Sequence, residues 1–263
     1  MSGVIEFNAE AARRIEAAYL TTDVVAQRLV VHEALDIRAG ERVLDIGSGP
    51  GLLAHELSKT VGPEGHVCGV DISDAMIEMA RHRCAGQPQC EFKNAEARTL
   101  PFEDETFDAA VSTQVYEYVA DIPAAMRELH RVVRRGGRVC IIDTDYDSLV
   151  IHTEHPERMR RVLEAWDAHF VHSDLPRKLA PALTAAGFEV GRRSAIPIFN
   201  PEFQPNAFSY HLLPLMGAFA RAQEGVAPGE AEAWLAEFED LNRKGEFFYS
   251  LNRYLFTARR PNS

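Results

Sequence analysis

The feature that constrains this chain most is an apolar stretch that runs straight into a glycine-rich turn. Residues 43–46 (Val-Leu-Asp-Ile) precede Gly47, Gly49 and Gly51, and apolar residues at helical spacing follow. This order is typical of a buried strand, a tight loop and the start of a helix. Because glycine has no Cβ, the backbone and a ligand approach closely at such a loop. The segment therefore predicts a nucleotide-type ligand at the carboxyl end of a strand.

The spacing within the turn narrows the kind of nucleotide. A dinucleotide fingerprint needs its third glycine at the sixth position of the turn, where this chain has Leu52, with Gly51 one place early. Asp45 stands just before the turn, and its carboxylate would repel a diphosphate but attract a cation. No Gly-Lys-Ser/Thr follows, so the phosphate loop of nucleoside triphosphatases is excluded as well. S-adenosylmethionine, which has an ammonium, a sulfonium and no phosphate, fits this pattern.

Further motifs follow in a familiar order over roughly residues 40–145. They are Gly69-Val-Asp-Ile-Ser73, Asn94-Ala-Glu96, Leu100-Pro-Phe102, Phe107-Asp-Ala109 and Arg134-Arg-Gly-Gly-Arg138. With the glycine turn, this series resembles the class I S-adenosylmethionine-dependent methyltransferases. It is similar in particular to the small-molecule branch that includes quinone-ring and natural-product methyltransferases. A single motif of this kind is weak evidence, but several in the right order are strong evidence.

Strand and helix patterns alternate along the chain, which predicts an α/β fold with a parallel sheet covered on both faces. The expected strands are 42–46, 66–70, 90–93, 107–112, 138–143, 188–196 and 247–258. The expected helices are 6–19, 22–35, 51–60, one that Ser73 caps, 122–133, 157–170, 175–186, 206–223 and 229–243. The resemblance implies a Rossmann-like, seven-stranded, mostly parallel sheet in which the last strand is antiparallel.

The same pattern predicts how the chain is divided. Residues 1–36 are expected to form an N-terminal helical lid, and 37–198 the cofactor-binding core. About fifty residues separate the last two strands, too many for a plain hairpin loop, so 199–246 are expected to form a helical substrate cap. Residues 247–263 complete the core with the final strand and a tail. The cap is rich in aromatic side chains, which predict an apolar pocket: Phe199, Phe203, Phe208, Tyr210 and Phe219.

The resemblance implies a set of cofactor contacts at the carboxyl ends of the strands. Asp45 and the turn hold the methionine end, Asp71 accepts the ribose hydroxyls, and Ile72 packs on the adenine. The adenine amino group meets Asn94 or Glu96, and the sequence leaves open which. Gln114 contacts the cofactor near the sulfonium. The expected set is Tyr19, Gln27, Asp45, Gly47, Ser48, Gly49, Gly51, Asp71, Ile72, Met76, Asn94, Ala95, Glu96 and Gln114.

Methyl transfer needs a general base only when the nucleophile carries a proton that must leave. The candidates for this role are His211, Asp145, Tyr146 and His172, with His211 foremost because it lies in the predicted cap. Residues 116–118 (Tyr-Glu-Tyr) replace the Leu-His-His that is more usual in similar proteins. A divalent metal is not expected, because the acids at 143–147 form one run instead of lying at separate strand ends.

Composition restricts partners and compartment. The 263-residue chain has a net charge of −11, which disfavours nucleic acid as a partner. No two of the four cysteines have metal-ligand spacing, no signal peptide is visible, and no apolar run reaches membrane-spanning length. We therefore expect a cytoplasmic monomer or homodimer that acts away from membranes.

The leading hypothesis is an enzyme that methylates oxygen, nitrogen or carbon of a small, ring-containing metabolite in a biosynthetic pathway. The first alternative is a methyltransferase that acts on RNA or protein. The usual Asn/Asp-Pro-Pro-aromatic motif of many such enzymes is replaced here by residues 112–115 (Ser-Thr-Gln-Val). The second alternative is a non-catalytic protein that only binds the cofactor.

Overall fold

A seven-stranded sheet forms the centre of the computed structural model, which describes residues 9–262. The strands are β1 (Arg42–Ile46), β2 (His66–Asp71), β3 (Cys90–Asn94), β4 (Phe107–Thr113), β5 (Val133–Ile151), β6 (Glu189–Asn200) and β7 (Tyr249–Arg259). Their order across the sheet is β3-β2-β1-β4-β5-β7-β6. Strands β1 to β5 pair in parallel, and β7 pairs antiparallel with both β5 and β6. The predicted Rossmann-like sheet with an antiparallel last strand is confirmed.

Helices alternate with the strands, close to the predicted positions. They are α1 (Ala9–Tyr19), α2 (Thr22–Leu35), α3 (Leu52–Val61), α4 (Asp74–Arg83), η1 (Tyr116–Tyr118), α5 (Ile122–Val132), α6 (Pro156–Asp167), α7 (Pro176–Ala185), α8 (Phe208–Ala220) and α9 (Glu230–Lys244). Residues 6–8 of the first expected helix lie outside the described residues. Ser73 caps α4 as expected, and its hydroxyl accepts a hydrogen bond from the Met76 N–H at 3.4 Å.

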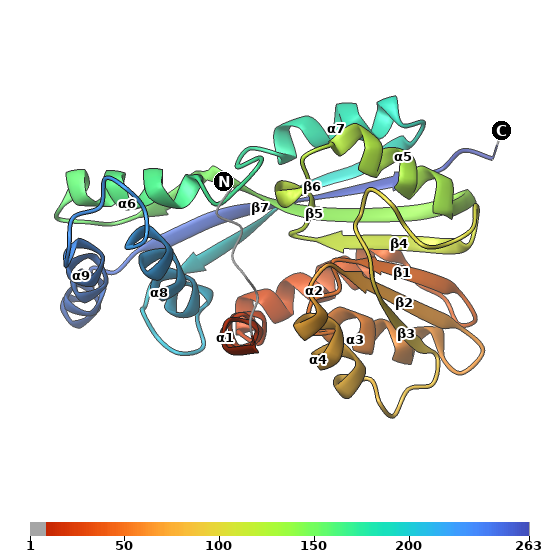
Figure 1. Cartoon of the computed structure of the whole chain (residues 1–263), viewed down its shortest axis with the longest axis horizontal. Coiled ribbons are helices and arrows are strands. Elements are labelled where there is room, and N and C mark those ends of the chain that lie inside the picture. Colours follow the sequence, from red (N-terminus) through yellow and green to blue (C-terminus); the bar gives the residue numbers. More distant parts are fainter. Residues whose placement is uncertain (1–8, 263) are drawn as a thin grey trace.

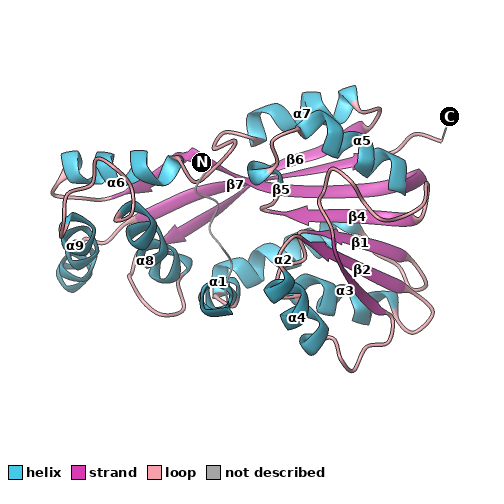
Figure 2. Cartoon of the chain, in the orientation of Figure 1, coloured by secondary structure: helices cyan, strands magenta, loops and turns pink. Residues whose placement is uncertain are grey.

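The helices cover both faces of the sheet, and the molecule has two ends (Figures 1 and 2). At one end, α5 and α7 lie on one face, while α2, α3 and α4 lie on the other. At the other end, β5, β6 and β7 continue beyond the parallel strands and meet α6, α8 and α9. Helix α1 lies between the two ends, near both α4 and α8. The parallel strands with α2, α3, α4, α5 and α7 therefore form one end of the molecule. The far ends of β5, β6 and β7 with α6, α8 and α9 form the other end, called the helical extension below.

Strand β5 is much longer than the expected strand 138–143. It starts at Val133, directly after α5, and continues through the acidic run to Ile151, with an irregularity in its pairing between Asp145 and Val150. The acids do not end the strand because two of them have partners within the fold. Asp143 accepts a hydrogen bond from the Val115 N–H, and Asp145 forms an ion pair with Arg177. Antiparallel pairing with β7 satisfies the backbone of the extension.

The helical extension has its own apolar core, which contains more than the predicted cap. Helices α8 and α9 lie between β6 and β7 in the chain, in the segment where the cap was expected. Met159, Val162 and Trp166 of α6 share a buried cluster with Trp234 and Phe238 of α9. The expected division of the chain assigned α6 to the core, so it leaves out one helix of this cluster. Helical spacing alone reveals an amphipathic helix but not the element against which it packs.

Polar contacts tie the N-terminal helices to the cap. The Asp23 carboxylate accepts hydrogen bonds from the Asn200 side chain at 2.7 Å and from the Phe208 N–H at 3.1 Å. On the other side, Arg28 donates to Glu56 at 3.0 Å and to the Tyr19 carbonyl at 2.6 Å. Helix α2 thus contacts both α3 and the segment expected to form the cap. Within residues 9–262, no helix combines the length and the apolar character needed to cross a membrane.

Candidate functional site

The glycine turn after β1 adopts a conformation that other residues rarely accept. Gly47, Gly49 and Gly51 have φ angles of +69°, +52° and +76°. A Cβ at Gly47 would lie 2.1 Å from the Val115 side chain, and one at Gly51 would lie 2.8 Å from Ala80. At Gly49 the nearest such atom is the Tyr19 ring at 4.0 Å. Two of the glycines therefore permit close packing of the fold, whereas Gly49 leaves space beneath the lid.

Asp71, the last residue of β2, fixes this turn through hydrogen bonds to backbone N–H groups. Its carboxylate accepts the Gly49 N–H at 2.9 Å through one oxygen and the Ser73 N–H at 2.9 Å through the other. Burial raises the pKa of Asp71, and these backbone donors oppose the shift. Each carboxylate oxygen can accept more than one hydrogen bond. Asp71 can therefore position the turn and still accept hydroxyl donors from a ligand.

Asp45 is a buried acid that forms no salt bridge with any cation of the described residues. Burial, together with the nearby Asp71 charge, raises its pKa to about 7. Its Oδ2 atom is buried without a hydrogen-bond partner, as is the Ser48 hydroxyl. A buried carboxylate is costly unless a positive group or hydrogen-bond donors compensate it. This edge of the sheet is therefore suited to a ligand that brings positive charge and hydrogen-bond donors.

Gln114 turns the chain sharply at the end of β4. Its φ angle is +59°, which is uncommon for a residue other than glycine. The Gln114 N–H donates to the Ile142 carbonyl at 2.7 Å, and the side-chain amide donates to the Thr144 hydroxyl. Backbone strain of this kind occurs mostly where a site requires it. Here the strained residue faces the same cavity as the glycine turn.

The residues expected around an adenine ring lie beside the turn, and they comprise one exposed apolar side chain and two polar side chains that already have partners. Ile72 is 60% exposed, so its apolar side chain is free to pack on a flat ring. The Asn94 amide donates to the Ile72 carbonyl at 3.0 Å and to Asp74 at 2.8 Å, and thus braces the loop after β2. Glu96 forms an ion pair with Arg98 at 2.6 Å. The choice between Asn94 and Glu96 as the adenine contact remains a prediction.

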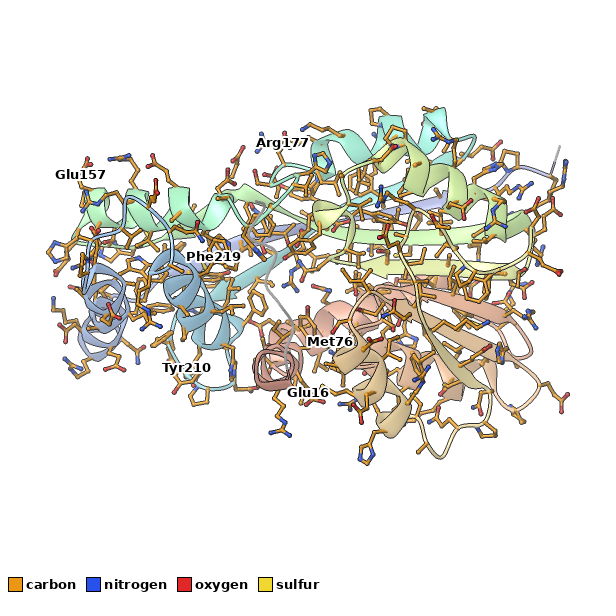
Figure 3. All side chains as sticks on the ribbon, viewed as in Figure 1. Glu16, Met76, Glu157, Arg177, Tyr210 and Phe219 are labelled. Atoms are coloured by element: carbon orange, nitrogen blue, oxygen red, sulfur yellow. The ribbon has the colours of Figure 1, made fainter. Side chains whose placement is uncertain are left out.

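One cavity of about 950 Å³ connects this edge with the cap. Pockets for a single small ligand usually measure 300–1,000 Å³, so there is room for a cofactor and a small second ligand. Most of the residues proposed from sequence line it: Tyr19, Gln27, Asp45, Gly47, Ser48, Gly49, Asp71, Ile72, Met76, Asn94, Ala95, Glu96, Gln114, Tyr146 and His211. Figure 3 shows Met76 of α4 and Glu16 of α1 near the junction of the lid and the core.

The structure does not bring three of the proposed residues to the cavity wall. Gly51 packs against Ala80. Asp145 is held by both of its oxygens in an ion pair with Arg177, each contact at 2.8 Å (Arg177 is labelled in Figure 3). The His172 Nε2 atom is buried without a partner, away from the cavity lining. Asp145 and His172 therefore do not line this cavity, and their catalytic roles remain predictions.

The remaining two base candidates do line the cavity. The His211 Nε2 atom lies 2.8 Å from the Pro205 carbonyl, so a neutral ring donates its proton there. Tyr146 stacks on Phe170 with ring centroids 4.0 Å apart, and burial raises its pKa well above the ordinary value. This contact occupies the Nε2 atom of His211 and leaves Nδ1 as its acceptor atom, whereas Tyr146 keeps its phenol proton at neutral pH. Their catalytic roles remain predictions.

Of the five cap aromatics expected to form an apolar pocket, two line the cavity, Phe208 and Tyr210. Phe199 is 54% exposed and packs on Phe248, whereas Phe219 packs on Trp166. Phe203 packs on Tyr210. Tyr118 and Trp166 are aromatic residues of the cavity wall that the sequence analysis did not propose. The unusual Tyr-Glu-Tyr sequence at residues 116–118 is the sequence feature that could have indicated Tyr118 as a cavity residue.

Two charged residues of the cavity were also missed, Glu117 and Arg253, and each is only 1% exposed. The Glu117 carboxylate accepts the Thr144 N–H at 3.2 Å, and burial raises its pKa to about 7. Arg253 of β7 lies opposite Thr144 in the sheet and donates to the Gln27 side chain at 2.5 Å. No local motif marks Arg253, because its role depends on the pairing of β7 with β5.

A family model for a methyltransferase domain matches residues 44–141. A Streptomyces fradiae protein, described as an uncharacterized 37.1 kDa protein in transposon TN4556, is 34% identical over 261 residues, which cover 95% of this chain and 72% of that protein. Demethylmenaquinone methyltransferase of Staphylococcus aureus is 33% identical over 121 residues, 46% of this chain and 50% of that enzyme. The chain belongs to the class I S-adenosylmethionine-dependent methyltransferases.

Solved structures agree on the fold of this methyltransferase. A putative methyltransferase from Bacillus halodurans C-125 superposes with a TM-score of 0.63 at 17% identity, covering 90% of this chain and 99% of its own. The YcgJ protein of Bacillus subtilis gives a TM-score of 0.62 at 20% identity, covering 91% and 100%. The chain spans only half the length of the demethylmenaquinone enzyme, so this match does not identify the methyl acceptor of the present protein.

The methyltransferase uses S-adenosylmethionine, and the residues present fit this cofactor. The ligand brings the positive charge that buried Asp45 lacks, and the space above Gly49 has no Cβ to obstruct it. Asp71 retains acceptor capacity for ribose hydroxyls beyond its two backbone donors.

Proposed function

We propose that this methyltransferase transfers a methyl group to oxygen, nitrogen or carbon of a small, ring-containing metabolite. The observation that carries the proposal is the single cavity that runs from the cofactor edge into the aromatic cap. Tyr118, Tyr146, Trp166 and Phe208 contribute flat apolar surfaces to it. Such surfaces suit a ring more than a flexible polar chain.

We propose that the cofactor contacts are those that line the cavity at the strand ends. Asp45 faces the positive methionine end, Asp71 accepts the ribose hydroxyls, and Tyr19 covers the turn from the lid. When bound, S-adenosylmethionine supplies an electrophilic methyl group on a leaving group that is already activated. The task of the protein is then to align the acceptor atom, to exclude water and to manage any proton.

Glu117 is the residue best placed to remove such a proton. It lines the cavity directly after the strained turn at Gln114, and its carboxylate is fixed by the Thr144 N–H. A general base works best when its pKa lies near the working pH, and burial raises the pKa of Glu117 to about 7. Glu117 stands within the Tyr-Glu-Tyr segment that replaces Leu-His-His, so a carboxylate takes the place of an imidazole in this proposal.

The test is methyl transfer from labelled S-adenosylmethionine to a panel of phenols, aryl carboxylic acids, aryl amines and quinols, with bulk RNA and unfolded protein as further acceptors. We expect label in at least one ring compound and none in the macromolecules. Label in RNA or protein alone would favour the macromolecule alternative. Binding of the demethylated cofactor, adenosylhomocysteine, without transfer to any acceptor would favour a non-catalytic binding protein.

The net charge of −11 and the depth of the cavity support a small acceptor over a macromolecule. Glu117, Arg253 and Gln27 are all buried, so an acceptor atom must enter the cavity to reach them. A folded RNA or protein would need a flexible segment to enter. We propose a monomer or homodimer in the cytoplasm as the working form.

A further inference from the structure

Arg253 is a buried cation that faces the cavity without an anionic partner. Its side chain donates to the neutral Gln27 amide, and its guanidinium lies 4.5 Å from the centre of the Phe208 ring. Its Nε–H is buried and has no acceptor. Within residues 9–262, no salt bridge reaches its guanidinium, although its charge acts on the Glu117 carboxylate and lowers the pKa of that group. A buried cation in this state is costly unless a ligand compensates it.

Trp166 presents a second donor of the same kind. Its indole Nε1–H is buried without an acceptor, and the residue lines the same cavity from α6. A tryptophan at a pocket usually finds a hydrogen-bond partner for this group. Two unsatisfied donors therefore belong to the cap-side wall, whereas the unsatisfied atoms at the cofactor edge are the acceptor Asp45 Oδ2 and the Ser48 hydroxyl.

The strand order separates Arg253 from the cofactor edge. The glycine turn follows β1, and Arg253 is on β7, with β4 and β5 between them. Neighbouring strands lie about 4.8 Å apart, so the two strands are about 14 Å apart. Gln27 comes from α2, whereas Phe208 of α8 and Trp166 of α6 belong to the apolar cluster of the helical extension. The donors therefore face the acceptor end of the cavity.

We propose that Arg253 and Trp166 form a receptor for a carboxylate carried by the methyl acceptor. Arg253 supplies the charge and the planar donors that a carboxylate prefers, and Phe208 and Gln27 hold its guanidinium in place. The substrate class is then a ring compound with a carboxylate group. This inference rests on the proposed function, because it names the kind of small molecule that the methyltransferase accepts.

The first test measures binding of probe pairs to the protein saturated with adenosylhomocysteine, by calorimetry. The pairs are benzoate with benzamide and 2-naphthoate with 2-naphthamide, which differ in charge but little in shape. We expect the carboxylates to bind about tenfold more tightly than the amides, and Arg253→Met and Trp166→Phe to reduce this preference. Arg193→Met, at an exposed arginine of β6, is the control and should retain it.

The second test observes Arg253 itself and does not depend on the folding of the uncharged Arg253→Met variant. In protein labelled with ¹⁵N-arginine, the Nε–H resonance of Arg253, assigned with Arg253→Lys, should shift when benzoate binds. Equal binding of carboxylates and amides overturns the proposal. A resonance that adenosylhomocysteine alone shifts and benzoate does not shift further also overturns it, because the homocysteine carboxylate would then be the ligand of Arg253. Failure of the wild type to bind adenosylhomocysteine contradicts the proposed function itself, whatever the probes do.

Discussion

The two ends of the cavity offer opposite chemistry to a ligand. At the cofactor edge, Asp45 is buried and Asp71 is half-buried, and the Asp45 Oδ2 atom lacks a hydrogen-bond donor. At the cap end, Arg253 and Trp166 carry N–H groups that lack an acceptor. One end is built for a cation and the other for an acceptor-rich group. A methyl transfer from a sulfonium to an anionic acceptor would neutralise both charges inside such a cavity.

The two ends also differ in how the chain assembles them. The cofactor edge uses loops that directly follow β1, β2 and β4, so each contact is close in sequence to its strand. The cap end joins positions far apart in the chain, as in the contact of Arg253 with Gln27 and that of Asn206 with Thr22. A local motif can therefore specify the first end, whereas the second depends on how lid, cap and final strand pack.

The strongest way to break the cofactor edge alone is Gly47→Ala. The new Cβ would lie 2.1 Å from Val115, and φ would remain at +69°, so the turn must move. We expect adenosylhomocysteine affinity to fall about 100-fold or more, measured by calorimetry. The matched control is Gly40→Ala, which has φ +82° but no atom within 4 Å. It should cost about 1–2 kcal/mol of stability and leave affinity unchanged. Equal affinity in both variants contradicts the assignment of the turn.

Glu117→Gln is expected to act on chemistry without acting on cofactor binding. Loss of a general base lowers kcat by about 100-fold or more, while adenosylhomocysteine affinity stays within a few-fold of wild type. The measurement is single-turnover methyl transfer to the acceptor found in the panel, from pH 6 to 9. The wild-type rate should rise through about pH 7, the pKa of Glu117, and the variant should lack this step. His211→Ala is the comparison: if it abolishes turnover while Glu117→Gln does not, the histidine is the base.

The junction of lid and cap is probed by Asp23→Ala. The substitution removes the acceptor for the Asn200 amide and for the Phe208 N–H. We expect a loss of about 2 kcal/mol in the free energy of unfolding, from urea denaturation, because two donors are left without their charged partner. The control is Asn206→Ala, which removes only an exposed hydrogen bond to Thr22 and should cost about 0.5 kcal/mol. A loss for Asp23→Ala no larger than that of the control would mean that lid and cap are not coupled.

The smallest expected effect is the pH dependence of cofactor binding. The pKa of Asp45 is about 7, so raising the pH from 6 to 8 ionises it. Because the ionised form attracts the ammonium group of adenosylhomocysteine, its affinity should rise about tenfold over this range. Asp45→Asn should bind more weakly and show no such rise. A wild-type affinity that stays flat from pH 6 to 8 would contradict the role of Asp45.

The stability of the ligand-free protein depends on the ionisation of Asp45 in the opposite direction. Since folding raises the pKa of Asp45 from 3.8 to about 7, its stabilising contribution is complete below pH 3.8 and is lost as pH rises through 7. Ligand-free Asp45→Asn is therefore expected to unfold at a higher temperature than wild type at pH 8. The same variant thus weakens binding and strengthens the empty fold, a combination that simple misfolding cannot produce.

The amino-acid sequence alone determined the cofactor end of this protein. The apolar run into the glycines, the acid after β2 and the alternation of strands and helices are local patterns, and the structure places them at one edge of the predicted sheet. Strand ends were less predictable. The acids Asp143 and Asp145 predicted that β5 ends near residue 143. In the structure Val115 and Arg177 are their partners, and a polar side chain can be buried within a strand when it is paired.

Only the tertiary structure decided the acceptor end. Gln27 and Arg253 lie on different elements, and nothing near either residue in the chain indicates that they meet. The same holds for α6, whose apolar face could have packed on the core but instead joins the cap. The physical reason is that a ligand turn depends on backbone conformation, which neighbouring residues fix, whereas a buried charge depends on which distant elements surround it.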